Sequence, residues 1–178
     1  LPQGAEQRLR AAVDFYVSQQ AADGGMPTDR PGRVQWCHGT PGFIGLFIKG
    51  YQTFNDSKYL QAAEAAANFT EINGIILKGN LVGHGAVGNA YLVMSLYLAT
   101  GDPLWIRKGL GMQLVALDSS PYTDSYSCIP GSAWIDGNGG MGFMYSDLLS
   151  NAQDLTQMGQ LQFAMPSFGE AMWDYGYV

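Results

Sequence analysis

The chain has 178 residues, of which 47% are apolar and 13% are charged, so it is long and apolar enough for one domain with a real core. Its net charge of −6 argues against nucleic acid and against anionic membrane surfaces as partners. No apolar run is long enough to cross a bilayer, because Lys49 interrupts the most apolar early stretch. We expect a processed or truncated chain, since it begins at Leu1.

Six segments in chain order carry helical patterns, the last of them the glycine-rich stretch 136–149 as a third inner helix. Three of them have a polar and an apolar face, which is typical of helices on the outside of a fold: residues 5–20, 56–72 and 102–117. The two segments between them are apolar nearly all round and are predicted to be buried on most sides: residues 41–54 and 85–100. Only the short stretch 73–80 resembles a strand or hairpin, so the pattern favours an all-α fold.

The sequence repeats with a period of 46 residues, which is typical of stacked supersecondary units. At this offset His38 meets His84, Gly39 meets Gly85 and Gly42 meets Gly88. A third copy has Gly139 and Gly142, with Asn138 in the place of the histidine. We expect the paired glycines to let backbones, or a ligand, approach closely at the start of each apolar helix.

Outer and inner helices that alternate in this way predict repeated helical hairpins that form part of an α/α toroid. Residues 1–178 form a single domain of about three and a half hairpins, with an apolar tail at 151–178. We expect an open arc with an exposed apolar flank, unless a partner or a further segment completes the ring. Asp56 and Asp102 are predicted helix caps.

Two cysteines and two glycosylation sequons bear on the cellular compartment. Cys37 and Cys128 could form one disulfide, or one of them could bind a metal while the other is buried. Sequons begin at Asn55 and at Asn68, and they hint at secretion if the two asparagines are exposed.

Three motifs together resemble the C-terminal half of lanthionine synthetase C-like proteins. They are Trp36-Cys37-His38-Gly39, the segment His84-Gly-x-x-Gly-Asn-Ala-Tyr91, and a glycine-rich third copy that ends in "YSDLL". The resemblance covers most of residues 5–150 and implies a seven-hairpin α/α toroid with one zinc ion at its mouth. Bacterial members of this family add cysteine thiols to dehydrated residues, and eukaryotic members bind glutathione.

The resemblance implies that Cys37 and His84 are zinc ligands. Gly83 stands where the family has a further cysteine ligand, so the site is degenerate. Catalytic zinc ordinarily has three protein ligands, and the third could be Cys128 or Asp136. His38 is a candidate for orienting a ligand or the substrate, and Trp36 and Trp134 could line the mouth of the site or fill the rim of the barrel.

Three functions remain open from the sequence. The first is zinc-dependent thiol addition or glutathione binding, with a small thiol or a peptide as partner; the family resemblance favours the cytoplasm for it. The second is a non-catalytic, secreted glycoprotein that uses the helical repeat for assembly into oligomers or filaments. The third is a carbohydrate-active toroid enzyme. Such an enzyme needs a pair of carboxylates at the mouth of the toroid, and only Asp136 lies near the start of an inner helix.

Overall fold

The computed structural model describes residues 4–29, 32–76 and 82–117, together with positions 142, 146 and 149. Within these ranges the chain forms α-helices and no strand, so the prediction of an all-α fold is confirmed. The only bridge of the β type among them is an isolated pair, Gln35 with His38. The five helices are α1 (Ala5–Ser18), α2 (Thr40–Phe54), α3 (Ser57–Asn73), α4 (Ala86–Thr100) and α5 (Leu104–Leu117).

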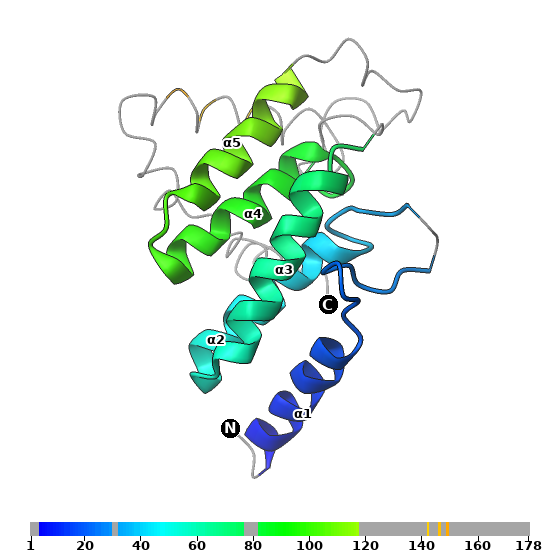
Figure 1. The fold of residues 1–178 in the computed structure, drawn as a ribbon, viewed down its shortest axis with the longest axis vertical. Coiled ribbons are helices and arrows are strands. Elements are labelled where there is room, and N and C mark those ends of the chain that lie inside the picture. The colour runs from blue at the N-terminus through cyan, green and yellow to red at the C-terminus, as the bar shows by residue number, and fades with distance from the viewer. Residues whose placement is uncertain are drawn as a thin grey trace, which may run out of the picture.

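The helices pack as hairpins, as the repeat predicts. Helix α2 packs against α3, α4 packs against α5, and the two hairpins meet where α2 and α3 contact α4. Helix α1 packs against α2, so α1 and α5 lie at opposite ends of the assembly (Figure 1). The predicted third copy lies mostly outside the described residues, although Gly142, Ser146 and Leu149 are helical.

The inner helices are the apolar ones. Ten of the fifteen residues of α4 are buried, and α2 buries Ile44 and Phe47 completely. Full burial of a side chain such as Phe47 stabilises the fold by about 2–3 kcal/mol. Helix α3 presents a stripe of alanines to them, and this stripe lets the backbones approach closely: Ala62, Ala63, Ala66 and Ala67. The core therefore lies between the two hairpins.

Polar side chains set the helix starts where the sequence predicts them. Asp56 accepts a hydrogen bond from the backbone N–H of Lys58 at 3.2 Å, and Asp102 accepts one from that of Leu104 at 2.9 Å. Both aspartates are thus helix caps, as predicted. Helix α1 ends two residues earlier than its pattern indicates, at Ser18, whose hydroxyl donates to the carbonyl of Phe15 at 2.6 Å.

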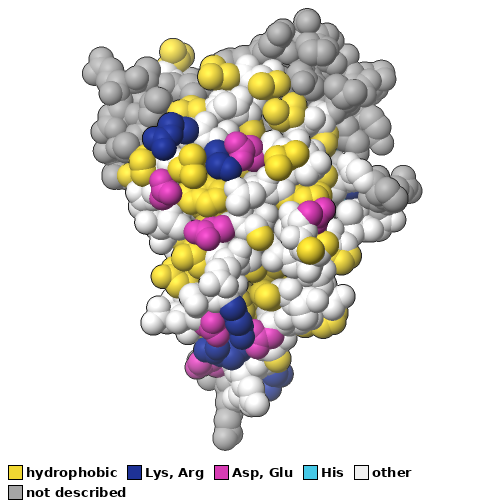
Figure 2. Space-filling view, viewed as in Figure 1, with side chains coloured by type: hydrophobic (Ala, Val, Ile, Leu, Met, Phe, Trp, Pro, Cys, Tyr) yellow, Lys and Arg dark blue, Asp and Glu magenta, His cyan; other side chains and the backbone are white. Residues whose placement is uncertain are grey.

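Apolar side chains are also exposed, as expected of an open arc. In α1 only Val13 is buried, whereas Phe15 is 57% exposed and Leu9 is 52% exposed. Figure 2 shows hydrophobic side chains spread over one face of the molecule, with one cluster of acidic and basic side chains near its lower end and further charged side chains over its upper half. Among the described residues, no helix combines the length and the apolar character needed to cross a membrane.

Candidate functional site

The first motif forms a tight turn that ends at α2. The backbone N–H of His38 donates to the carbonyl of Gln35 at 3.2 Å and closes the turn around Trp36 and Cys37. Gly39 then adopts a φ of 129°, which favours glycine. A Cβ on Gly39 would also lie 2.2 Å from the carbonyl oxygen of Arg33, so this position has no room for a side chain.

The second motif forms a turn at the start of α4. Gly83 and Gly85 are buried, and His84 between them is half-buried. A Cβ on Gly88 would lie 1.7 Å from the carbonyl oxygen of Val82, and one on Gly42 of the first motif would lie 2.5 Å from that of Trp36. The second glycine of each of these two motifs therefore lets the incoming turn fold back onto its helix, and the prediction of close packing is confirmed for Gly42 and Gly88, whereas a Cβ on Gly142 of the third copy would meet nothing of the described chain within 4 Å.

The two turns are joined by their backbones. The N–H of Cys37 donates a hydrogen bond to the carbonyl of Gly83 at 3.3 Å. Because His84 follows Gly83 directly, the two residues predicted to be metal ligands lie on adjacent, hydrogen-bonded turns. The 46-residue repeat pairs Cys37 with Gly83 in sequence, and the fold places the same two residues side by side.

The thiol of Cys37 contacts a polar side chain from the same turn. Gln35 is only 1% exposed, and its side-chain amide Nε2 donates to Sγ of Cys37 at 3.1 Å. Cys37 itself is exposed. A buried amide therefore fixes the direction of a sulfur that small molecules can reach from solvent.

The other predicted residues of the first turn lie around this sulfur in different environments. The side chain of His38 is 50% exposed, and its Nδ1 lies 3.9 Å from a carboxylate oxygen of Asp29. That carboxylate is shared with the guanidinium of Arg33, 3.1 Å away. Trp36 is half-buried and packs against the hydrophobic core, an arrangement that fits a residue filling the rim.

Several predicted site residues lie outside the described part of the chain: Cys128, Trp134 and Asp136. A third zinc ligand and a disulfide between Cys37 and Cys128 therefore stay predictions. Within the residues that the structure describes, no group of three or more His, Cys, Asp and Glu side chains comes together. Of the predicted zinc ligands, Cys37 and His84 lie within the described residues, and their role as ligands stays a prediction.

The two sequon asparagines are both exposed. Asn55 occupies the left-handed position that ends α2, with a φ of 50°. Asn68 lies inside α3, where its Oδ1 accepts a hydrogen bond from Nζ of Lys108 at 2.8 Å. Thr70, the third residue of that sequon, is fully buried and donates its hydroxyl to the carbonyl of Ala66. Glycosylation at either position stays a prediction.

Two functional candidates have no role that the motifs predict, although Asn89 stands within the second motif. Gln35 contacts the sulfur of Cys37, and Asn89 is a fully buried amide on the first turn of α4. The repeat carried a signal for Asn89, because the equivalent positions in the other two copies are Phe43 and Phe143. A polar residue at an otherwise apolar repeat position indicates a local role.

Comparisons with known proteins agree with the motifs. A family model described as lanthionine synthetase C-like protein matches residues 2–153. The chain is 40% identical over 70 residues to a Danio rerio protein named glutathione S-transferase LANCL1, covering 39% of this chain and 17% of that protein. It is 30% identical over 127 residues to LanC-like protein GCL1 of Arabidopsis thaliana, covering 63% of this chain and 29% of that protein. The match thus spans less than a third of either relative.

Proposed function

The chain belongs to the lanthionine synthetase C-like family, and from this premise we propose that it handles small thiols at the joined turns of Cys37 and His84. The observation that carries the proposal is the hydrogen bond from the N–H of Cys37 to the carbonyl of Gly83. It keeps a thiol and an imidazole on adjacent turns at the ends of two buried helices. The relative named glutathione S-transferase supports glutathione as the thiol.

We propose that Cys37 and His84 hold a zinc ion together with a third ligand, Cys128 or Asp136. A thiolate and an imidazole are ligand types that zinc prefers, so the described donors fit two of three protein positions. Gly83 offers only a backbone carbonyl, and that carbonyl already accepts the hydrogen bond from Cys37. When bound, zinc lowers the pKa of a coordinated thiol and favours the nucleophilic thiolate.

The residues of the chain supply orientation and access. The buried amide of Gln35 directs the sulfur of Cys37, and the core contact of Trp36 keeps the turn on the end of the hairpin. The exposure of Cys37 leaves room for a small thiol to approach. His38 and Asp29 lie at the rim, where an imidazole beside a carboxylate can orient a polar group of the ligand.

Metal content by mass spectrometry tests the proposal directly. We expect close to one zinc per chain, lost in Cys37→Ala and in His84→Ala and retained in His38→Ala, which changes the neighbouring imidazole of the same turn. Cys128→Ala and Asp136→Asn, measured separately, identify the third ligand. Zinc that is absent from the wild-type chain, or present unchanged in both ligand variants, would overturn the metal site. Calorimetric titration with glutathione then tests binding of the thiol.

A second candidate is an assembly module, and the exposed apolar surface of α1 favours it. Leu9 and Phe15 are each more than half exposed, and exposed apolar surface marks a partner site where it forms a contiguous patch. Light scattering after size exclusion measures the oligomeric state. Assembly through α1 predicts oligomers that dissociate in Phe15→Glu and persist in Gln52→Glu, an exposed change on α2. A monomeric wild-type chain would exclude this candidate.

A further inference from the structure

Asn89 connects three segments of the chain at one buried point. It lies on the first turn of α4 and is fully buried. Its Nδ2 donates to the carbonyl of Val34 at 2.7 Å, in the turn before α2, and to the carbonyl of Gly74 at 2.8 Å, at the end of α3. A single amide group thus uses both of its protons to tie the second motif to the first one and to α3.

The repeat shows that this amide is not a requirement of the hairpin architecture. The equivalent positions in the first and third copies hold Phe43 and Phe143, which are apolar. Both donors of the Asn89 amide are paired, but its buried Oδ1 has no hydrogen-bond partner among the described residues, so burying this amide costs free energy. We therefore connect Asn89 with a local role, which is to hold the turn before α2. That turn carries the thiol of Cys37.

The contacts of Asn89 lead to both proposed ligands. Val34, whose carbonyl Asn89 holds, is followed directly by Gln35, and the amide of Gln35 donates to Sγ of Cys37 at 3.1 Å. The backbone N–H of Asn89 also donates to the carbonyl of Gly85, directly after His84, at 3.5 Å, and this ordinary helical bond does not depend on the side chain. The side chain of Asn89, itself part of the second motif, thus contacts the backbone just before the first one.

Gly74 leaves the space that this arrangement requires. A Cβ at Gly74 would lie 3.1 Å from Nδ2 of Asn89 and 2.4 Å from the carbonyl oxygen of Thr70. A side chain at residue 74 would thus clash with the end of α3 itself and would crowd the amide of Asn89. This close approach comes from an element that carries neither motif, so the position of the two turns depends on α3 as well.

We propose that Asn89 is a positioning residue that holds the turn of Cys37 in register with the turn of His84. The expected effect of Asn89 on metal affinity rests on the proposed function. The register of the two turns can be tested without that function, because the hydrogen bond from Cys37 to Gly83 reports it directly.

Two measurements on Asn89→Leu and Asn89→Ser test the proposal. Leu shares the branched shape of Asn, with larger terminal groups, and removes both donors, whereas Ser is smaller, avoids overpacking and cannot reach both carbonyls. We expect the amide proton of Cys37 to exchange with solvent at least about tenfold faster in either variant. We also expect Co²⁺, used as a spectroscopic probe of the thiolate and imidazole, to bind at least about tenfold more weakly.

Thr70→Val is the matched control. It removes the hydrogen bond from a fully buried hydroxyl to the carbonyl of Ala66 but contacts neither motif. It should lower the melting temperature while leaving both the exchange of the Cys37 amide and the affinity for Co²⁺ as in the wild type. The same behaviour in the Asn89 variants would mean that Asn89 is only structural and would overturn the proposal. A wild-type chain that does not bind Co²⁺ would refute the proposed metal site, and the exchange rate would still decide the role of Asn89.

Discussion

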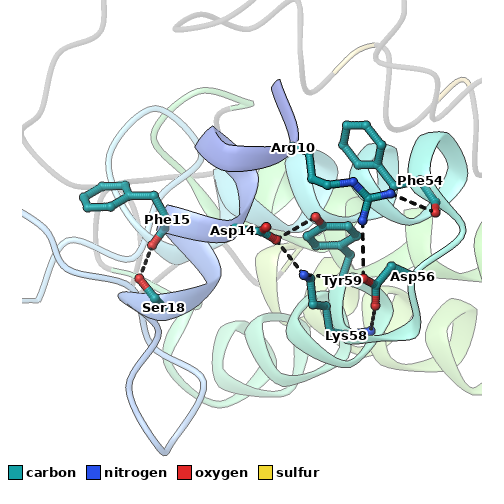
Figure 3. Close-up of polar contacts among 8 residues, drawn as sticks. All are labelled: Arg10, Asp14, Phe15, Ser18, Phe54, Asp56, Lys58 and Tyr59. Carbon is teal, nitrogen blue, oxygen red and sulfur yellow. Dashed lines mark hydrogen bonds and ion pairs between the residues drawn. The ribbon is translucent and has the colours of Figure 1, made fainter. Parts of the chain in front are cut away.

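Tyr59 donates its phenolic hydrogen to a carboxylate oxygen of Asp14, 2.7 Å away, and thereby ties α3 to α1 (Figure 3). The same oxygen lies 2.8 Å from Nζ of Lys58, which also lies 3.4 Å from the helix cap Asp56. Arg10 of α1 reaches the carboxylate of Asp56 from the other side at 3.5 Å. Because α1 buries only one residue, this polar network is a main attachment of α1 to the hairpins.

The network predicts a loss of stability in acid. Hydrogen bonds from Lys58 and Tyr59 hold the pKa of Asp14 below its ordinary value of 3.8. A carboxyl group whose pKa is lowered by folding stabilises the fold above its unfolded pKa, and this contribution disappears as the pH falls through the folded pKa. Thermal unfolding between pH 7 and pH 2 should therefore show an acid decline that is shallower in Asp14→Asn.

Tyr59→Phe is the matched variant for this measurement. It removes one hydrogen bond, at a cost of about 1 kcal/mol, but leaves the ion pair between Asp14 and Lys58. We expect lower stability at neutral pH and an acid decline that persists in part. An acid decline that is equally steep in Asp14→Asn and the wild type would show that other carboxyl groups control it.

In alkaline solution the same network predicts a loss of stability as the pH rises. Burial raises the pKa of Tyr59 above its ordinary value of 10.0, and the hydrogen bond to Asp14 raises the pKa of Lys58 above 10.5. Groups whose pKa is raised by folding stabilise the fold below their unfolded pKa, and the contribution is lost as the pH rises through the folded value. Unfolding in urea above pH 10 should show a decline that is smaller in Tyr59→Phe.

The glycines of the chain differ sharply in what a methyl group would meet. A Cβ on Gly88 would lie 1.7 Å from a backbone oxygen, whereas Gly111 on the exposed side of α5 has nothing within 4 Å. Gly88→Ala should lower the free energy of unfolding by more than about 2 kcal/mol, because backbone must move. Gly111→Ala should raise it by about 0.5–1 kcal/mol, because alanine favours helices. Equal effects in urea titrations would contradict this account of the motif glycine.

The cap of α5 gives a smaller and more local prediction. Asp102 accepts a hydrogen bond from the N–H of Leu104 at the start of the helix. Loss of such a cap costs about 1 kcal/mol. Asp102→Ala should therefore lower the free energy of unfolding by that amount, and Asp102→Asn, which retains a capping oxygen, should restore most of it. A variant series without this rescue would show that charge and not capping is the cause.

The helices could be predicted from the sequence because their causes are local. Apolar residues at helical spacing, with Asp56 and Asp102 before two of the segments, place the described helices to within about two residues of their observed bounds. The arrangement of hairpins followed from the 46-residue repeat. The early end of α1 was not predicted, because the bond from the Ser18 hydroxyl to the carbonyl of Phe15 leaves no pattern in the sequence.

The candidate site could be predicted only in part. Its motifs pointed to Cys37 and His84, whereas the contact between their turns depends on backbone atoms that carry no sequence signal. Gln35 and Asn89 act through donors aimed at a sulfur and at distant carbonyls. The repeat marks Asn89 as a polar exception to Phe43 and Phe143, but the pattern predicts neither the carbonyls that Asn89 contacts nor the contact of Gln35 with a sulfur two residues away.

The degenerate position itself can be restored as a last test of the metal site. Gly83 is the backbone partner of Cys37 and precedes His84, so a cysteine there would add a thiolate beside the two proposed ligands. We expect Gly83→Cys to bind zinc at least about tenfold more tightly, because thiolates are strong zinc ligands. Gly83→Ser adds a side chain of similar size without the thiol and controls for crowding, since Gly83 is buried. Competition with a chromophoric chelator measures the affinity. Equal zinc affinity in both variants would mean that the turns of Cys37 and His84 do not face a common metal position.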